Sequence, residues 1–281
     1  LIGSSTPSYW YLFIVPNLDF IVFPNPNLEK SRILCDDIHN QTKKSWKDHN
    51  FLVDKIDVLC GGPPCQGFST ANRQRLIDDP RNKLYKQFIK SVDTFKPKVT
   101  LMENVSGIFN KKDDIINDFK NIGYSGICLK LNAEDFNIPQ RRRRVFFIMY
   151  NENKIQIDLD SFSSIITNSI NSKKTSSSFK LKDAIFDLPK LEAKNIKNNT
   201  ELENDKFGYF KSENNSQPTD FVKFINGTSQ KSSFIYNHKT RYNNERDIKI
   251  FSLLKQGGDS SSDEIKHLNP YKNRGDIFKD K

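Results

Sequence analysis

The feature that most constrains the fold is the alternation of short apolar runs with amphipathic segments between residues 56 and 150. Short apolar runs bounded by turn residues are typical of buried strands, and apolar residues at helical spacing indicate helices. The expected strands are Ile56–Cys60, Val99–Met102, Gly126–Leu131 and Val145–Tyr150. The expected helices are Asn82–Phe95 and Asp113–Asn121. This alternation predicts an α/β fold: a Rossmann-like, mostly parallel sheet with helices on both faces.

After residue 150 the pattern weakens. Residues 161–178 are rich in Ser, Asn and Lys, which predicts a linker or a surface excursion. We expect a short helix over Leu181–Leu188 and an amphipathic helix over Asn244–Lys255. The apolar face expected for the second helix carries Ile248, Phe251 and Leu254.

The composition limits the kinds of partner and site that the chain can have. Lys and Arg number 44 against 34 Asp and Glu, a formal net charge of +10. This excess favours a polyanionic partner such as nucleic acid, although an AT-rich genome would also enrich Lys. The four cysteines form no CxxC pair, which argues against a zinc site and fits a reducing compartment. No apolar run has membrane-spanning length, and the apolar stretches near the start lack the basic lead of a signal peptide.

A candidate nucleophile loop directly follows the first expected strand. It reads Gly61-Gly62-Pro63-Pro64-Cys65-Gln66-Gly67-Phe68-Ser69. Open α/β sheets form sites beyond the carboxyl ends of their strands. The glycines allow a tight turn, and the prolines stiffen the approach to the thiol. Cys65 is therefore a candidate nucleophile, because a thiolate is strongly nucleophilic near neutral pH. Cys60, inside the strand, is expected to be a buried structural residue.

A carboxyl group follows the next expected strand, in Glu103-Asn104-Val105. Beside a nucleophile, it could bond the Watson–Crick edge of a base and stabilise charge that develops at cytosine N3. Three residues alone would equally fit a helix cap or a turn. Their place about 40 residues after the proline–cysteine loop favours the functional interpretation.

Four arginines precede the last expected strand, in Gln140-Arg141-Arg142-Arg143-Arg144. Such a run is most often a solvated patch that binds phosphates. Strand alternation would point Arg142 and Arg144 to one side, and the other two to the opposite side. If this strand runs antiparallel to its neighbours, it begins at the same sheet edge as Cys65 and Glu103.

Together these motifs resemble those of the DNA cytosine-5 methyltransferase family, over about residues 35 to 150. Pro63–Ser69 is similar to its nucleophile loop, Glu103–Val105 to its Glu-Asn-Val motif, and Gln140, Arg142 and Arg144 to its Gln-x-Arg-x-Arg motif. Asp37 is similar to the family residue that contacts the adenine of the cofactor. Further segments similar to the family are residues 79–82, 181–189 and 244–247.

The resemblance implies a sheet of the S-adenosylmethionine-dependent methyltransferase type. It also implies methyl transfer from S-adenosyl-L-methionine to C5 of a flipped cytosine in duplex DNA, through a covalent adduct between Cys65 and C6. The implied catalytic residues are Cys65, Glu103, Arg142 and Arg144. The implied cofactor-binding residues are Asp37, Pro63 and Pro64. The implied substrate-binding residues are Gln66, Ser69, Asn104 and Gln140. The implied setting is the cytoplasmic methylase of a restriction–modification system, a monomer at the nucleoid with a cognate restriction endonuclease as partner.

The chain departs from the family near its start. The Gly-rich turn that holds the cofactor has no counterpart in Leu1–Pro7, and the acidic residue that ends the second strand is absent around Phe23–Asn25. We therefore expect a fragment truncated at both ends. Residues 1–160 would form the catalytic core, and residues 161–281 a linker with a partial, poorly patterned target-recognition region.

Two alternatives stay open. A tRNA cytosine-5 methyltransferase of the same fold would usually carry a Cys-Phe-Thr string, which does not occur here. An inactive remnant that binds DNA is favoured by the missing Gly-rich turn but opposed by the intact Cys65, Glu103 and Arg144. A cysteine hydrolase has little support, because none of the four histidines stands in a recognisable partner motif.

Overall fold

The structure is a computed structural model of the 281-residue chain. It describes residues 11–14, 20–21, 33–34, 42–48, 56–63, 84–175, 179–193, 211–214, 216–227, 234–238, 240, 242–258 and 262–268. The chain divides into two compact units. The first comprises Leu1–Asn132 and Arg142–Lys174, and the second comprises Ala133–Arg141 and Thr175–Lys281.

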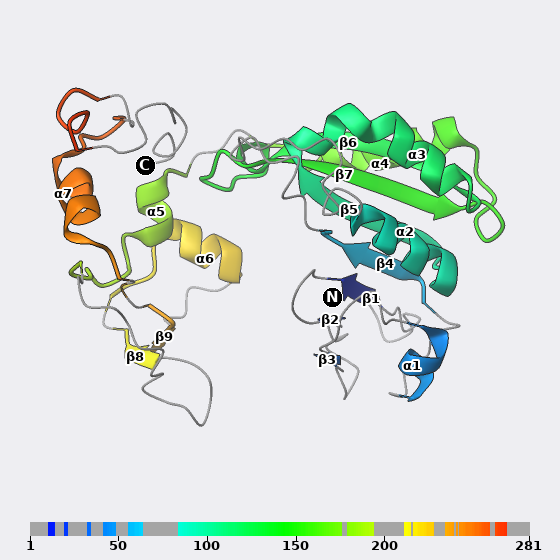
Figure 1. Cartoon of the computed structure of the whole chain (residues 1–281), viewed down its shortest axis with the longest axis horizontal. Coiled ribbons are helices and arrows are strands. Elements are labelled where there is room, and N and C mark those ends of the chain that lie inside the picture. Colours follow the sequence, from blue (N-terminus) through cyan, green and yellow to red (C-terminus); the bar gives the residue numbers. More distant parts are fainter. Residues whose placement is uncertain are drawn as a thin grey trace. The chain divides into compact units, whose positions relative to one another are not determined.

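The first unit is built on a seven-stranded sheet in the order β3-β2-β1-β4-β5-β7-β6 (Figure 1). Its strands are β1 (Tyr11–Ile14), β2 (Phe20–Ile21), β3 (Ile33–Leu34), β4 (Val58–Gly61), β5 (Val99–Val105), β6 (Tyr124–Asn132) and β7 (Arg143–Asn151). Strands β1, β4 and β5 are parallel, and β7 runs antiparallel to both of its neighbours. β2 is also reversed relative to β1 and β3. The predicted mostly parallel sheet is confirmed, with β2 and β7 as the reversed strands.

One face of this sheet is covered by α2 (Leu84–Phe95) and α3 (Lys112–Lys120). The apolar residues of α2 recur at helical spacing, and Phe88, Ile89, Val92 and Phe95 are buried. They form one cluster with Met102 of β5 and with Val145, Phe147 and Met149, which alternate along β7. α1 (Lys43–Asp48) adds Trp46 to the same cluster, with its ring 4.8 Å from that of Phe95.

The opposite face carries α4 (Leu159–Asn171), so helices lie on both faces as predicted. Its Phe162 packs on Tyr150 of β7, with ring centroids 4.5 Å apart. The expectation of a linker is therefore wrong for residues 161–171. Asp158 caps the helix by accepting a hydrogen bond from the Ser161 amide at 2.8 Å. The Ser and Asn side chains occupy its exposed side, and apolar residues recur every three or four positions.

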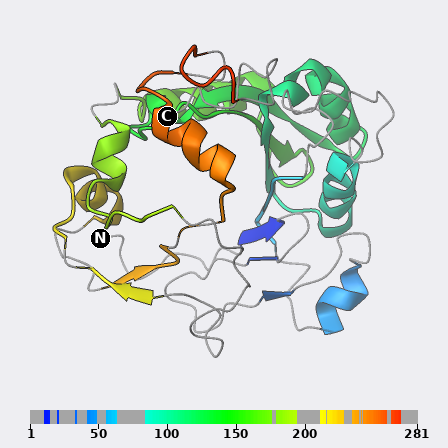
Figure 2. The same cartoon turned by 60° about the vertical axis from the view of Figure 1, so that its left-hand side comes forward.

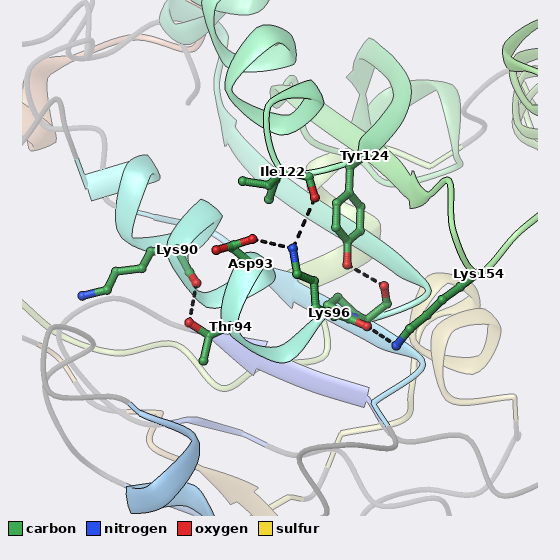
Figure 3. Close-up of polar contacts among 8 residues, drawn as sticks. Lys90, Asp93, Thr94, Lys96, Ile122, Tyr124 and Lys154 are labelled. Atoms are coloured by element: carbon green, nitrogen blue, oxygen red, sulfur yellow. Dashed lines mark hydrogen bonds and ion pairs between the residues drawn. The ribbon is translucent and has the colours of Figure 1, made fainter.

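The link between α2 and β5 is fixed by polar contacts at the sheet edge where β5 begins (Figure 3). Lys96 has a positive φ of 47° and pairs with Asp93 at 2.5 Å. Lys154 donates to the Lys96 carbonyl at 2.5 Å, and the buried Tyr124 hydroxyl donates to the Pro97 carbonyl at 2.6 Å. Burial raises the pKa of Tyr124 to about 12, so the hydroxyl stays protonated at neutral pH. These contacts determine where β5 enters the sheet.

The second unit contains three α-helices, a 3-10 helix (Ala133–Asp135) and a two-stranded antiparallel sheet in its described residues. The helices are α5 (Leu181–Ile185), α6 (Asp220–Asn226) and α7 (Glu245–Leu253), and the strands are β8 (Lys211–Glu213) and β9 (Phe234–Tyr236) (Figure 2). The predicted helices over Leu181–Leu188 and Asn244–Lys255 are confirmed. The face expected for α7 is wrong at Phe251, which is 43% exposed, because Ile250 packs against Ile265 instead.

Gly126 of β6 provides a test of the sheet packing. A Cβ at this position would lie 2.1 Å from the carbonyl oxygen of Ile148 and 2.7 Å from the Cα of Met149. We expect Gly126→Ala to lower the free energy of unfolding by about 3 kcal/mol, because backbone atoms cannot yield as a side chain can. Urea denaturation followed by circular dichroism measures this, with Lys130→Ala at an exposed position of the same strand as control. Equal midpoints for the two variants would contradict this packing.

Candidate functional site

Three segments from distant parts of the first unit meet at one edge of its sheet. Gly61 pairs with Met102, so Gly62 and Pro63 continue beside Glu103 and Asn104. Val105 pairs with Arg144, at the beginning of the antiparallel β7. The condition set for this strand, that it runs antiparallel to its neighbours, is met, and β7 begins beside the end of β5 that carries Glu103. The carboxyl ends of β4 and β5 and the start of β7 form the candidate site.

An ion pair joins β5 to β7 at this edge. The Nε of Arg144 lies 2.9 Å from Oε1 of Glu103, and the side chains are 23% and 36% exposed. Arg144 also donates from its Nη1 to the Arg143 carbonyl at 2.8 Å. The register places both side chains on the sheet face opposite to α2 and α3. Arg144 therefore holds one oxygen of the Glu103 carboxylate while the group stays open to solvent.

The second carboxylate oxygen of Glu103 lies against Gly62. A Cβ built on Gly62 would be 3.2 Å from Oε2 and 3.7 Å from the Glu103 carbonyl oxygen. The 3.2 Å separation from Oε2 is tighter than ordinary van der Waals contact. The absent side chain of Gly62 therefore leaves the space that the carboxylate uses. The sequence marked Gly62 only as a turn residue, and its contact with Glu103 follows from the β4–β5 register.

Asn104 connects β5 to the start of the nucleophile loop. Its side chain is buried, with 3% of its surface exposed. Nδ2 donates to the Pro63 carbonyl at 3.0 Å, and Oδ1 accepts from the Val105 amide at 2.8 Å. Both ends of the amide are thus used within the chain, and they hold the buried Pro63 in place. A direct contact of Asn104 with substrate stays a prediction.

The arginine run is divided between the two units. Arg142 and Arg143 are exposed, and only Arg144 reaches Glu103. The expected alternation holds for Arg143 and Arg144, but Arg142 precedes the strand. Arg141 belongs to the second unit, where it pairs with Glu134 at 3.3 Å. Gln140 lies in the same unit and is exposed.

The remaining predicted site residues fall outside the described part of the chain. They are Asp37, Pro64, Cys65, Gln66 and Ser69. Cys60, by contrast, is described: it is buried, and burial raises its pKa to about 11. The expectation that Cys60 is structural is confirmed. The described residues contain no cluster of His, Cys, Asp or Glu suited to a metal ion. Among the helices in the described ranges, none has the length and apolar character of a membrane span.

Comparison with known proteins gives one family. Residues 27–275 match the family described as C-5 cytosine-specific DNA methylase. The Type II methyltransferase M.DdeI of Desulfomicrobium norvegicum is 39% identical over 183 residues, 61% of this chain and 40% of that protein. The Type II methyltransferase M1.HphI of Haemophilus parahaemolyticus is 45% identical over 101 residues, 34% of this chain and 27% of that protein. The matched regions thus span less than half the length of these relatives.

A solved structure supports the fold. It is the crystal structure of a prophage-encoded protein of E. coli that is assigned as a DNA modification methyltransferase. The two structures superpose with a TM-score of 0.53 at 22% identity, covering 82% of this chain and 64% of the other. At this identity, the likeness establishes a shared fold.

Thiol reactivity tests whether the two described cysteines are inert. The pKa of Cys60 is raised to about 11 by burial, and that of Cys128 to about 11 by burial against the opposing effect of Lys112 and Lys130. At pH 8, roughly one thiol in a thousand would be ionised. We expect iodoacetamide to label both cysteines at least a hundredfold more slowly in the native protein than in urea, as measured by peptide mass spectrometry. Labelling of Cys60 at the same rate in the native protein and in urea would contradict its burial.

Proposed function

Because the chain belongs to the C-5 cytosine-specific DNA methylase family, we propose that it transfers a methyl group to C5 of cytosine in duplex DNA. The observation that carries this proposal is the Glu103–Arg144 ion pair, 2.9 Å long, beside Gly62 and Pro63. Cys65 follows Pro63 by two residues in the sequence. A carboxylate oriented next to a thiol-bearing loop can hold a cytosine ring while the thiol attacks it.

The proposed reaction begins with a cytosine flipped out of the duplex, because stacking shields its ring from the thiol. The Cys65 thiolate adds to C6, and a proton shared between Glu103 and N3 offsets the negative charge that moves into the ring, while a Glu103 oxygen accepts a hydrogen bond from the exocyclic amine. C5 would then take the methyl group as the bond between the methyl carbon and the donor's sulfonium sulfur breaks, which leaves a neutral thioether. Loss of the C5 proton to a base and expulsion of the Cys65 thiolate restore the C5–C6 double bond.

The chain's residues divide this work between them. Arg144 keeps the Glu103 carboxylate in place, and Asn104 fixes the carbonyl of Pro63. We assign Arg142, Gln140, Gln66 and Ser69 to contacts with the flipped nucleotide or its phosphates, as in the sequence-based expectation. Asn104 acts in this proposal through the Pro63 carbonyl that it holds.

The methyl donor in this proposal is S-adenosyl-L-methionine. What supports a site for this donor is the sheet edge where the parallel strands β1 and β4 end together, with Ile14 paired to Gly61. Open α/β sheets bind adenosine-containing ligands at this kind of edge. Pro63 lies there and is buried, and Asp37 and Pro64 complete the proposed binding set. When bound, the donor supplies an activated methyl group.

The substrate is proposed to be double-stranded DNA within a restriction–modification system, with a cognate endonuclease as partner and the monomer as the active form. Residues 1–160 would supply the catalytic core. Residues 161–281 would supply part of the target-recognition region, although α4 packs on the sheet of the first unit. Sequence recognition would require groove contacts from that region.

Covalent trapping tests the proposed reaction. The substrate is a long random-sequence duplex containing 5-fluorocytosine, because fluorine cannot leave C5 as a proton does. With S-adenosyl-L-methionine present, we expect an adduct at Cys65 that is detected by denaturing electrophoresis and peptide mapping. Cys65→Ser should form none, and Glu103→Gln should form it about a hundredfold more slowly. Cys128→Ser serves as the matched control and should react as the wild type does.

The outcomes of trapping separate the alternatives. Absence of an adduct from folded wild-type protein that binds duplex DNA would contradict the proposed reaction and support an inactive DNA-binding remnant. Preferential trapping on tRNA would show that the substrate is tRNA and not duplex DNA. An adduct from Cys65→Ser would reject this nucleophile.

Gly62 provides a second test. We expect Gly62→Ala to lower kcat by roughly tenfold to a hundredfold, because its Cβ would displace the Glu103 carboxylate from the position set by Arg144. The KM for DNA should change little. In a Glu103→Ala background, the same substitution should have almost no further effect on single-turnover rates. An equal loss in both backgrounds would show that Gly62 acts by another route.

A further inference from the structure

An aromatic ring holds two lysine ammonium groups near the candidate site. The Nζ of Lys130 lies 3.6 Å from the centroid of the Phe109 ring, and that of Lys112 lies 5.2 Å away. Both distances are within the range of cation–π attraction. Phe109 itself packs against the buried core of the first unit. The positions of these two cations are therefore restricted, although lysine side chains at a surface are usually mobile.

These lysines lie on the other side of the sheet edge from Glu103. Phe109 belongs to a 3-10 helix, Ser106–Lys111, that begins directly after β5. Lys130 pairs with Val145, which pairs with Asn104, so the Cα atoms of Lys130 and Asn104 are roughly 10 Å apart across two strand spacings. Alternation places Lys130 and Asn104 on the face covered by α3, opposite to the Glu103 side chain.

The surrounding charge is mainly positive. Lys111 precedes Lys112 in the chain, and Arg143 lies on the same sheet face as Val145, the residue that pairs with Lys130. The Ser106 hydroxyl donates to the Arg143 carbonyl at 3.3 Å. We call Phe109, Lys111, Lys112, Lys130 and Arg143 the Phe109 patch. Its nearby carboxylates are Asp114, 3.2 Å from Lys111, and Asp113, 4.0 Å from Lys112. Within the described residues, neither Lys130 nor Arg143 forms an ion pair, so the patch keeps an excess of positive charge.

We propose that the Phe109 patch binds the phosphate backbone of the duplex, on the opposite side of the sheet edge from the Glu103–Arg144 pair. This inference rests on the proposed function, because duplex DNA is the substrate proposed above. Lys130 lies roughly 10 Å from Asn104, the neighbour of Glu103, across two strand spacings. The excess positive charge of the patch therefore lies within reach of the phosphates next to a base that a duplex presents to Glu103.

The salt dependence of DNA binding tests the proposal. Each phosphate contact lowers log K by about 0.9 per decade of salt concentration. The double variant Lys112→Gln/Lys130→Gln should therefore flatten the slope of log K against log[NaCl] by nearly 2 and weaken binding on the order of tenfold. Fluorescence anisotropy with a labelled random-sequence duplex measures both quantities. Lys112→Arg/Lys130→Arg keeps both charges and should retain the wild-type slope.

The matched control is Lys90→Gln/Lys120→Gln, which removes the same charge from exposed positions on α2 and α3 outside the patch. This variant should bind DNA and transfer methyl groups as the wild type does. Equal slopes for the patch variant and the control would overturn the proposal. Methyl transfer by the wild type, measured separately, distinguishes the two hypotheses. If the patch variant flattens the slope but the wild type transfers no methyl group, the Phe109 patch binds DNA and the proposed activity is rejected. If the wild type transfers methyl groups but the patch variant keeps the wild-type slope, the activity stands and the proposal for the patch is rejected.

Discussion

The antiparallel pairing of β7 with β5 is the constraint on which the candidate site depends. A parallel β7 would begin beside Val99, at the opposite end of β5 and four residues before Glu103. Because the strand is reversed, Val105 pairs with Arg144, and the last residues of one strand meet the first residues of the other. The connection through α3 and β6 makes this reversal possible, since β6 runs alongside β7 along its whole length. The ion pair between Glu103 and Arg144 is a direct result of this topology.

The two faces of the sheet have different roles at this edge. Residues on one face enter the hydrophobic cluster beneath α2 and α3, where Met102 and Val145 are fully buried. Residues on the other face, Glu103 and Arg144 among them, keep contact with solvent. Strand alternation thus places a packing residue and a polar residue at successive positions of one short segment. Asn104 belongs to the buried face but is polar, and its hydrogen bonds to Pro63 and Val105 satisfy its amide there.

Much of the first unit could be predicted from periodicity. The segments around α2, α3 and β4–β7 have apolar patterns that fit a single element each, and the structure differs from the predicted bounds mainly at the ends. α4 escaped prediction because its Ser and Asn residues suggested a linker, whereas the signal was present in the Asp158 cap and the spacing of Phe162 from the later isoleucines. α7 was placed correctly, but its apolar residues occupy several faces, so the buried one depends on its contact with Ile265.

The candidate site could be predicted in part. The motifs indicate the chemistry of Glu103 and Arg144, and they bring the two residues to one edge of the sheet only if the last strand is antiparallel, as it is in the structure. The close approach of Gly62 to the Glu103 carboxylate could not be foreseen, because it depends on the residue-by-residue alignment of two strands. The position of the second carboxylate oxygen depends on a contact between Gly62 and Glu103, which come from two different segments of the sequence.

The hydrogen bond from Asn104 to Pro63 has a mechanical consequence. Pro63 cannot turn about its own N–Cα bond, and its carbonyl is held at 3.0 Å by a buried amide that belongs to the sheet. The peptide plane that leads into Pro64 is therefore part of the rigid body of the first unit. Cys65, the proposed nucleophile, follows Pro63 by two positions in the sequence. Only the backbone bonds of Pro64 and Cys65 therefore separate the proposed nucleophile from a carbonyl group that the end of β5 holds in place.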